Sequence, residues 1–345
     1  ANQKLSGTAE EWEVKIWRFA ALLSGTVETS IKVSTSGSTG TPKIIEHGRK
    51  ALLSSAAMTC NALQLQKGNT ALLCLPADKI GGMMMIARSF YMGMKLVCIK
   101  PSLKVLHEIN ALQIDFASFT PMQFSDILQD DAAFDSAAAI PKIILGGEGV
   151  QPALLEKIKQ LPNAVYSTFG MTETISHIAL KKLNGADADK YYRVLPGVSI
   201  SADARNCLVI EAPLLGQPHL VTNDVVNIVA ANEFEWLGRD DNVINTGGVK
   251  LQPEVIENTL RDKMPFPFFV AGVADAVSGF KPVLVVEAPA VAAQELMAIQ
   301  GAVATLDKIS QPKEMVLITG FIYTGTGKIN RATTLLQPVT KRIAL

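Results

Sequence analysis

The stretch that decides how this chain is interpreted is Ser34-Thr35-Ser36-Gly37-Ser38-Thr39-Gly40-Thr41-Pro42-Lys43. Its small residues let the backbone turn tightly, so that successive N–H groups can converge on an anion, while hydroxyls and Lys43 add donors and positive charge. A β-rich run, Ile31–Val33, precedes the stretch, and a helical pattern begins near His47. Phosphate-binding loops occupy this place before a helix, so the stretch predicts one.

Two other interpretations of this loop have to be weighed. A loop rich in glycine and serine is commonly a flexible surface segment, and composition alone favours that interpretation. A Walker A loop needs glycine directly before the lysine and serine or threonine after it. Pro42 and Ile44 occupy those positions, which excludes Walker A. The rest of the chain must decide between a phosphate loop and a surface loop.

Downstream of the loop, short apolar runs alternate with helical patterns as far as Ser167. This alternation predicts a mainly parallel sheet with helices on its faces, and ligands bind beyond the carboxyl ends of such strands. The expected strands are 71–75, 95–99, 116–119, 142–145 and 164–167. The expected helices are 82–92, 103–112, 122–128 and 152–160.

The amino-acid composition of the chain changes after Leu195-Pro196-Gly197. Residues 200–229 are rich in β-formers and predict an antiparallel, β-rich subdomain that closes a large N-terminal domain. We place the domain boundary in the polar segment Leu237–Asn242, which divides the chain into residues 1–240 and 241–345. The second part, with a helix opened by Pro253, predicts a small α+β domain. The expected fold class is therefore α/β.

The composition excludes several classes of function. Of the 345 residues, 48% are hydrophobic and 19% are charged, with 32 basic and 32 acidic side chains. A neutral chain without a dense basic run argues against nucleic acid as a partner. The first 25 residues predict an amphipathic helix, and no apolar run is long enough to span a bilayer. The scattered cysteines and histidines predict no zinc site and favour a reducing, cytoplasmic location.

Further motifs follow the loop in a fixed order. Tyr166–Glu173 resembles the aromatic-Gly-x-Thr-Glu segment of the adenylate-forming superfamily, which contains acyl-CoA and aryl-CoA synthetases, luciferases and peptide-synthetase adenylation domains. The loop itself resembles the phosphate-binding signature of that superfamily. Its other motifs are matched, in order, by Gly146-Gly147-Glu148, Thr222-Asn223-Asp224 (with Asn223 in place of glycine), Gly238-Arg239-Asp240-Asp241 with Gly247-Gly248, and Thr326–Arg331. We therefore identify the chain as a member of this superfamily.

The resemblance implies a site for ATP and Mg²⁺. Thr172 would bond the α-phosphate, and Glu173 would help to hold Mg²⁺. Asp224, aided by Arg239, would accept the ribose hydroxyls. The ATP phosphates would be bound by Thr35, Ser36, Gly37, Ser38, Thr39, Gly40 and Lys43. The adenine would be bound by Gly146, Gly147, Glu148, Phe169 and Gly170.

The resemblance also implies a second half-reaction, with CoA as acceptor and no redox cofactor. Lys328 would reach the carboxylate and the α-phosphate during adenylation. The small domain would be a mobile lid that rotates about Asp241 between the half-reactions. Gly247 and Gly248 would then line the path of the CoA pantetheine. The sequence leaves the oligomeric state open.

The segment Leu75–Gly82, followed by Arg88, indicates which carboxylic acid the enzyme would activate. It resembles the pocket-forming stretch of o-succinylbenzoate–CoA ligases of menaquinone biosynthesis, with Lys79 in place of their usual histidine. Arg88 and Lys79 suit a second carboxylate, and Ser167 would also contact the acid. The loop begins at residue 34, so an N-terminally truncated form of the superfamily fold is expected. Another aryl-CoA or acyl-CoA synthetase, or a nucleotide-binding relative without turnover, remains the alternative.

Lys328→Ala is expected to abolish formation of the acyl-adenylate and to spare most thioester formation from adenylate that is supplied. The reason is that only the first half-reaction brings two anions together and needs this positive charge. Single-turnover assays of each half-reaction measure the two effects. Adenylation at the wild-type rate by this variant would refute the assignment of Lys328.

Overall fold

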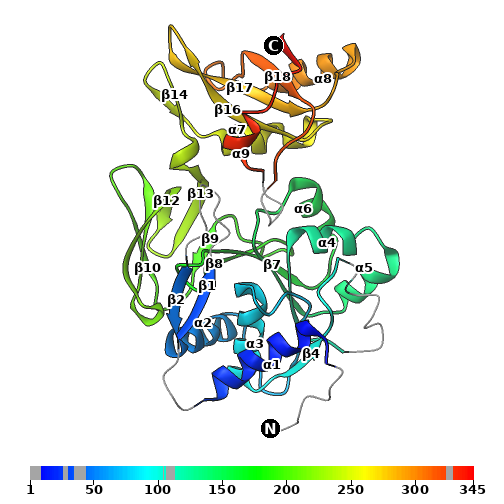
Figure 1. Cartoon of the computed structure of the whole chain (residues 1–345), viewed down its shortest axis with the longest axis vertical. Helices are drawn as coiled ribbons and strands as arrows, with labels where there is room; N and C mark the ends of the chain where they lie inside the picture. Colours follow the sequence, from blue (N-terminus) through cyan, green and yellow to red (C-terminus); the bar gives the residue numbers. More distant parts are fainter. Residues whose placement is uncertain (1–8, 26–29, 35–43, 104, 106–112, 324–328) are drawn as a thin grey trace.

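The computed structural model describes residues 9–25, 30–34, 44–103, 105, 113–323 and 329–345 (Figure 1). The predicted phosphate loop from Thr35 to Lys43 lies outside the described residues, as does Lys328. Most of the helix that the sequence predicts over 103–112 also lies outside them. These predictions therefore stay predictions.

The predicted parallel sheet is present and forms one half of an eleven-stranded sheet. Its strands, in spatial order, are β4 (Lys95–Cys98), β3 (Thr70–Leu73), β5 (Phe116–Phe119), β6 (Lys142–Leu145) and β7 (Ala164–Gly170). Neighbouring strands in this half pair in parallel register. Alternate residues of each strand face opposite sides, which is why Leu72 and Leu73 belong to two different apolar clusters.

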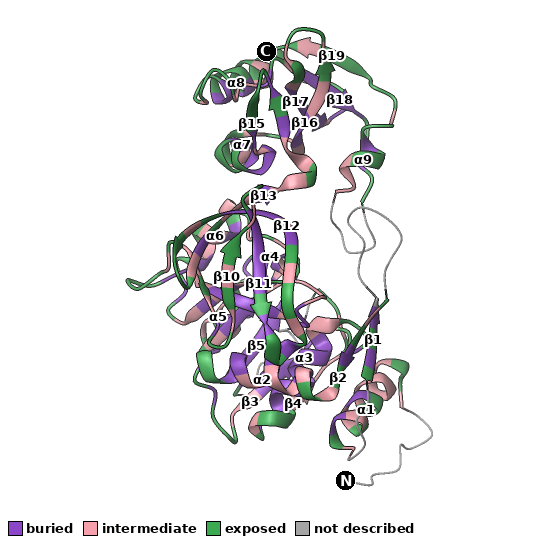
Figure 2. Cartoon of the chain, turned by 90° about the vertical axis from the view of Figure 1, so that its left-hand side faces the viewer, coloured by how far each residue is buried: buried purple, intermediate pink, exposed green. Residues whose placement is uncertain are grey.

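Helices cover both faces of the parallel half. One cluster joins the sheet to α1 (Glu11–Ser24), α2 (Arg49–Ala62) and α3 (Ile80–Met92). The other joins the opposite face to α4 (Pro121–Ile127), α5 (Asp131–Ala138) and α6 (Pro152–Ile158). Figure 2 shows the buried residues concentrated on the strands and on the helix faces that pack against them. The loops that follow the parallel strands lie at the carboxyl edge of the sheet, which these helices do not cover.

The β-rich subdomain continues the same sheet. Strand β8 (His177–Lys182) pairs antiparallel with β7 and so joins the two halves. Beyond it lie β9 (Tyr192–Val194), β13 (Glu233–Arg239), β12 (Gln217–Ala230), β11 (Cys207–Ala212) and β10 (Ser199–Ala202), with a 3₁₀ turn η2 at Pro213–Leu215. The rings of Phe169 on β7 and Phe234 on β13 lie 5.0 Å apart, although two strands separate β7 from β13 in the sheet. This short distance shows that the sheet curls strongly.

A second, six-stranded sheet is formed by the C-terminal part of the chain. Its path is β15 (Val249–Leu251), β14 (Ile244–Thr246), β17 (Gly279–Glu287), β18 (Glu314–Ile318) and β19 (Lys341–Ala344), and β16 (Phe268–Asp275) pairs with β17. The helical segments here are η3 (Asp240–Asn242), α7 (Pro253–Leu260), η4 (Arg261–Lys263), α8 (Ala293–Val303) and α9 (Arg331–Thr334). This sheet has its own apolar clusters on its two faces. The two cores support a boundary near residue 240, which we retain as a proposal.

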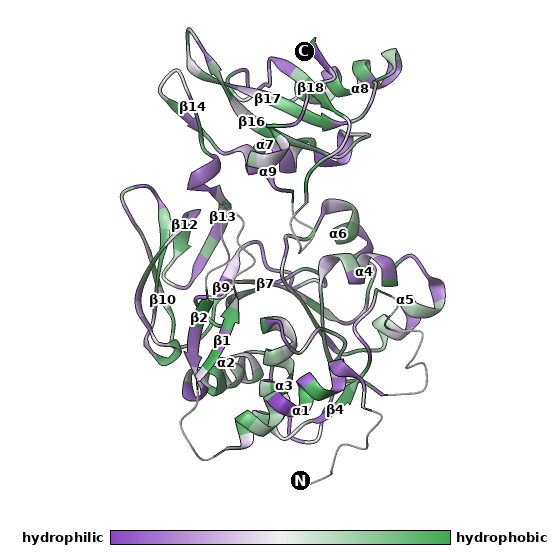
Figure 3. Cartoon of the chain, in the orientation of Figure 1, coloured by the Kyte–Doolittle hydropathy of each residue, from purple (hydrophilic) through white to green (hydrophobic). Residues whose placement is uncertain are grey.

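The polar segment between the sheets differs in part from the expectation. Leu237–Arg239 completes β13 instead of forming a turn, and only Asp240–Asn242 is a 3₁₀ turn. Figure 3 shows this short turn as hydrophilic between β13 and β14. The strand extends to Arg239 because its backbone pairs with Asp224 on β12.

The structure corrects one prediction about the phosphate loop. The chain after the loop forms a strand, β2 (Ile44–Gly48), which pairs antiparallel with β1 (Ser30–Ser34). His47 lies in this strand, and α2 begins only at Arg49. The loop therefore connects two strands of a hairpin, and the helix expected near His47 is present but begins two residues later, at Arg49. Burial alternates along this strand, with His47 buried and its neighbours exposed, but the adjacent Ile44 and Ile45 conceal that alternation in the sequence.

Within the described ranges, no helix is both long and apolar enough to cross a membrane. The apolar run Met83–Ala87 of α3 is buried against the large sheet.

Gly82 in the first turn of α3 leads to a test of this fold. A Cβ at Gly82 would lie 2.2 Å from the carbonyl oxygen of Pro76, whereas a Cβ at Gly81 would meet only the end of the Leu75 side chain at 3.1 Å. Gly82→Ala should therefore lower the free energy of unfolding by about 2 kcal/mol or more. Gly81→Ala is the matched control and should change it by less than about 1 kcal/mol. Equal effects in chemical denaturation would contradict the packing of this turn.

Candidate functional site

Two of the predicted motifs meet at the carboxyl edge of the parallel strands. Strands β6 and β7 are neighbours, with Leu145 opposite Ser167. The chain leaves β6 through Gly146–Glu148 and leaves β7 through Met171–Ser176. The structure therefore brings the glycine turn beside the Thr172–Glu173 segment, as the topology of the predicted sheet requires.

Close packing explains the glycine turn after β6. A Cβ on Gly146 would lie 2.8 Å from the hydroxyl of Thr168, which itself donates to the carbonyl of Leu145 at 3.0 Å. Gly147 has a φ of +96°, in the region that favours glycine. Glu148 is half-buried beside them. The turn is thus required by the fold, and its contact with adenine stays a prediction.

The Met171–Ser176 turn is held in an unusual conformation. Thr174 is fully buried, and its hydroxyl accepts from the N–H of Met171 and shares its one proton between the carbonyls of Met171 and Ser176. Ile175 is also fully buried and has a φ of +67°, which is costly for a β-branched residue. Thr172 and Glu173 remain half-exposed at the tip of this turn.

Gly170 allows the turn to fold back on β7. A Cβ at this position would lie 2.3 Å from the carbonyl oxygen of Ser176 and 2.4 Å from the Cα of His177. No other residue type fits this approach of two backbones, so the glycine in the aromatic-Gly-x-Thr-Glu segment is required sterically. Its predicted contact with adenine is untested.

His47 contacts the turn from the β1–β2 hairpin, and sequence reasoning did not select it. Its Nε2 lies 2.7 Å from the carbonyl oxygen of Thr172, and the side chain is 4% exposed. Burial lowers the pKa of His47, although the bond to Thr172 and the charge of Glu173 act in the opposite direction. No local pattern marked this contact, because the partners are 125 residues apart.

Glu173 carries the carboxylate that was predicted to help hold a divalent cation. No cluster of three or more metal-ligating side chains occurs in the described part of the chain. Mg²⁺ is commonly held by one or two carboxylates together with substrate phosphates and water. The donor set at Glu173 therefore fits Mg²⁺ bound together with a nucleotide, and does not fit a metal cage built by the protein alone.

The predicted adenine-stacking residue lies in an aromatic cluster. The ring centroid of Phe169 is 5.6 Å from that of Tyr192 and 5.0 Å from that of Phe234. Ser167, which is 3% exposed, shares a hydrogen bond of 3.0 Å with the hydroxyl of Tyr192. Burial raises the pKa of Tyr192, and the bond from Ser167 offsets part of that effect. Tyr192 is a further candidate that the sequence did not indicate.

The predicted ribose-binding pair is brought together by β12 and β13. Asp224 lies opposite Arg239 in the strand register, and the charged groups are 3.7 Å apart. Trp236 donates from Nε1 to a carboxylate oxygen of Asp224 at 2.9 Å. Burial acts to lower the pKa of Arg239, but its acidic neighbours outweigh burial and raise it. Sequence reasoning missed Trp236, whose indole orients the carboxylate.

Asp241, the predicted hinge residue, is bonded on both carboxylate oxygens. One oxygen accepts from Asn223 at 3.0 Å, and the other pairs with Arg239 at 2.7 Å. Arg205 bridges the carboxylate of Asp240 and the amide oxygen of Asn223 at 3.0 Å and 3.2 Å. The hinge prediction is not tested by these contacts. They do show that Asn223, in place of glycine, adds a link between β12 and the turn.

Arg88 on α3 lies inside the large core, within hydrogen-bond distance of Ser176 just before β8. It is 2% exposed and donates to the hydroxyl of Ser176 at 2.8 Å, while its Nε has no partner. In the part of the chain that the structure describes, no carboxylate is paired with it. Burial of Arg88 lowers its pKa to about 10. Burial of His177, together with the nearby charge of Arg88, lowers the pKa of His177 well below its usual value.

Lys79 and Arg88 are not brought together. Lys79 precedes the first turn of α3 and is exposed, whereas Arg88 is buried two and a half turns further along. Lys79 is the N-cap residue, with extended backbone, and Arg88 lies eight residues after Ile80, a rise of about 12 Å along the helix axis. The structure therefore separates an exposed Lys79 from a buried Arg88, and the predicted contact of Lys79 with the acid stays a prediction.

Gly247 and Gly248 form the two-residue turn between β14 and β15. Their φ values of +57° and +84° are those that a type I′ hairpin turn requires. The turn accounts for both glycines without a ligand, and the predicted path of CoA beside them is untested.

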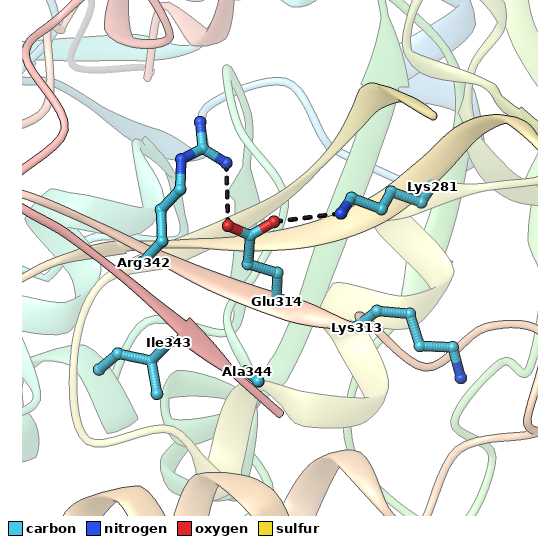
Figure 4. A pocket seen from close by; sticks show the side chains of 6 residues that line it. All are labelled: Lys281, Lys313, Glu314, Arg342, Ile343 and Ala344. Atoms are coloured by element: carbon cyan, nitrogen blue, oxygen red, sulfur yellow. Dashed lines mark hydrogen bonds and ion pairs between the residues drawn. The ribbon is translucent and has the colours of Figure 1, made fainter. Parts of the chain in front are cut away.

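A cavity of about 270 Å³ lies away from these motifs, in the six-stranded sheet (Figure 4). It is lined by Lys281, Lys313, Glu314, Arg342, Ile343 and Ala344. The carboxylate of Glu314 already pairs with Lys281 at 3.3 Å and with Arg342 at 3.0 Å. This cavity contains none of the predicted site residues, so the carboxyl edge of the large sheet remains the candidate site.

Comparison with known proteins supports this choice of site. The family model of AMP-binding enzymes matches residues 33–204, which include the phosphate loop, the glycine turn and the Thr172–Glu173 turn. The 2-succinylbenzoate–CoA ligases of Haemophilus influenzae and Escherichia coli are each 26% identical, over 66% and 73% of this chain. The chain spans 52% and 57% of the length of these two relatives. A probable 2-succinylbenzoate–CoA ligase of Mycobacterium tuberculosis is 26% identical, with 88% of this chain and 83% of that protein covered.

Solved structures extend the comparison to most of the chain. The o-succinylbenzoate CoA synthetase of Bacillus subtilis, in complex with its acyl-adenylate intermediate, has the same fold, with a TM-score of 0.74 at 22% identity over 89% of this chain and 69% of that one. An acyl-CoA synthetase (AMP-forming)/AMP-acid ligase II-like protein from Dyadobacter fermentans is 34% identical, with a TM-score of 0.67 over 96% of this chain and 95% of that one. Since the identity, the family model and the fold agree, the chain belongs to the AMP-binding enzymes of the adenylate-forming superfamily.

Proposed function

We propose that the protein is an ATP-dependent acid–CoA ligase that acts on o-succinylbenzoate. In the first half-reaction, an oxygen of the substrate carboxylate attacks the α-phosphorus of ATP and pyrophosphate leaves. In the second, the thiol of CoA attacks the acyl carbon of the adenylate, loses its proton and releases AMP. Family membership supports the chemistry, and the named relatives support this acid.

The observation that carries the choice of acid is the buried guanidinium of Arg88. A buried charge without a counter-charge is costly, and an Nε–H without a partner adds to the cost. A dicarboxylic acid would supply the missing negative charge with one carboxylate while the other is activated. Arginine suits this role because its planar fork matches a carboxylate. The bond from Arg88 to Ser176 connects this charge to the turn that carries Glu173.

The tip of the Met171–Ser176 turn would bind the nucleotide phosphates. Thr172 would donate its hydroxyl to the α-phosphate, and Glu173 would help to hold Mg²⁺, which would neutralise phosphate charge when bound. The residues of the phosphate loop, Thr35–Gly40 and Lys43, would donate to the β- and γ-phosphates. The attacking carboxylate and the α-phosphate that it attacks are both anions, so the site must neutralise their negative charge.

The remaining predicted residues complete both half-reactions. Asp224, oriented by Trp236 and Arg239, would accept the ribose hydroxyls. Lys328 would supply positive charge during adenylation. Rotation about Asp241 would then bring Gly247–Gly248 to the path of CoA.

We also propose a cytoplasmic location. All four cysteines are free, and burial raises the pKa of each, to about 11 for Cys60 and Cys98 and about 12 for Cys74. Free, protonated thiols, of which Cys98 is half-buried and the other three are buried, suit a reducing compartment.

The function is tested by thioester formation with three acids. With ATP, Mg²⁺ and CoA, o-succinylbenzoate should be converted at least tenfold more efficiently than benzoate or a short fatty acid, since only it adds a carboxylate for Arg88. Liquid chromatography of the CoA thioester measures the product. Strong activity on benzoate or fatty acids with none on o-succinylbenzoate would refute the acid and keep the ligase. Absence of ATP–pyrophosphate exchange with every acid would refute the ligase.

Arg88→Met tests the role of the buried charge. The variant should lose about tenfold to a hundredfold in kcat/KM for o-succinylbenzoate, because a bond to a charged group contributes about 1.5–3 kcal/mol. The KM for ATP should stay unchanged, and so should conversion of any monocarboxylate that the wild type accepts. The thermal midpoint should not fall, since an unpaired buried charge is removed. A uniform loss with all acids would instead indicate a structural role.

A further inference from the structure

The buried face of the β1–β2 hairpin carries one polar side chain among apolar ones. Ile31 and Val33 on β1 are buried, and they pair with His47 and Ile45 on β2. The residues between these positions are exposed. A histidine on such a face is costly to bury unless its ring is hydrogen-bonded. The bond that the structure gives to this ring goes to the carbonyl of Thr172 at 2.7 Å.

The carbonyl of Thr172 accepts two hydrogen bonds. The N–H of Ile175 donates to it at 3.0 Å and closes the turn, and His47 supplies the second donor from a different element. A carbonyl oxygen has two lone pairs, so both bonds can form at once. A neutral imidazole with its proton on Nε2 is sufficient as the donor.

The turn needs such support because its conformation is strained. Ile175 keeps a positive φ although it is β-branched, and such strain persists only where surrounding contacts over-determine the backbone. Thr174 supplies contacts from within the turn. His47 supplies one from outside it. Glu173 lies between Thr172 and Thr174, so its carboxylate is directed by the backbone that these contacts hold.

We propose that His47 is a positioning residue, which ties the Thr172–Glu173 turn to the hairpin and thereby places the Glu173 carboxylate for a Mg²⁺–nucleotide complex. The part of this inference that concerns Mg²⁺ rests on the proposed function. The part that concerns the backbone of the turn does not. The same strand, β2, follows the predicted phosphate loop in the chain, so His47 joins two segments that would bind the same triphosphate.

Three variants separate this role from simple packing. His47→Leu keeps an apolar side chain on the buried face and removes the donor. His47→Gln restores an N–H that can reach the carbonyl of Thr172. Ile45→Ala is the matched control, because it disturbs the same face of the same strand without touching this bond.

Hydrogen exchange tests the backbone part without any ligand. In His47→Leu, the amides of Thr174 and Ile175 should exchange about three- to tenfold faster, the range expected from one lost hydrogen bond. They should keep the wild-type rate in Ile45→Ala and recover most of it in His47→Gln. Unchanged exchange in His47→Leu, or equal acceleration in Ile45→Ala, would overturn the proposal.

Binding of ATP at increasing Mg²⁺ concentration, followed by calorimetry, tests the metal part. His47→Leu should need about tenfold more Mg²⁺ for half-maximal ATP binding, as is usual when a residue that orients a ligand is removed. His47→Gln should lie close to the wild type. Wild-type protein that does not bind ATP would refute the proposed function. Wild-type protein that binds ATP, beside a His47→Leu variant with the same Mg²⁺ requirement, would refute only the role of His47 towards the metal.

Discussion

The close approach of two backbones at Gly170 is the constraint on which the rest of the structure depends. Here β7, the last parallel strand, ends against the carbonyl of Ser176, and the chain returns at once as the antiparallel strand β8. The parallel half and the antiparallel half therefore form one curled sheet. The turn between β7 and β8 projects Thr172 and Glu173 at the carboxyl edge of the parallel strands, where ligands of such sheets bind.

Charges are distributed unevenly around this turn, and the distribution suits a reaction between anions. Arg88 is buried below the turn with an unbonded Nε, whereas the acidic side chains at the boundary between the sheets are paired with Arg205 and Arg239. A buried cation without a counter-charge raises the free energy of the folded state, and binding of an anionic ligand can offset that desolvation penalty. The carboxylates of Asp240 and Asp241 are already paired with arginines, so they do not require a charged ligand.

Much of the fold was predictable because its signals are local. The strands at 116–119 and 142–145 were predicted with their observed bounds, and Pro253 does open α7. The helix expected near His47 is also present, as α2 from Arg49, but the strand β2 before it was not predicted, because it depends on pairing with β1. Of the predicted site residues, Asp224 and Arg239 are brought together, whereas Lys79 and Arg88 are not.

The sequence by itself determined the residue types at the site and the alternation of strands and helices along the chain, since motif spacing and apolar periodicity are properties of neighbouring residues. Only the tertiary structure decided which side chains support that site. His47 and Thr172 are 125 residues apart, and Arg88 and Ser176 are 88 apart. Such contacts depend on how the hairpin and α3 pack against the sheet. Packing is a collective result of many apolar contacts, and no single stretch of sequence encodes it.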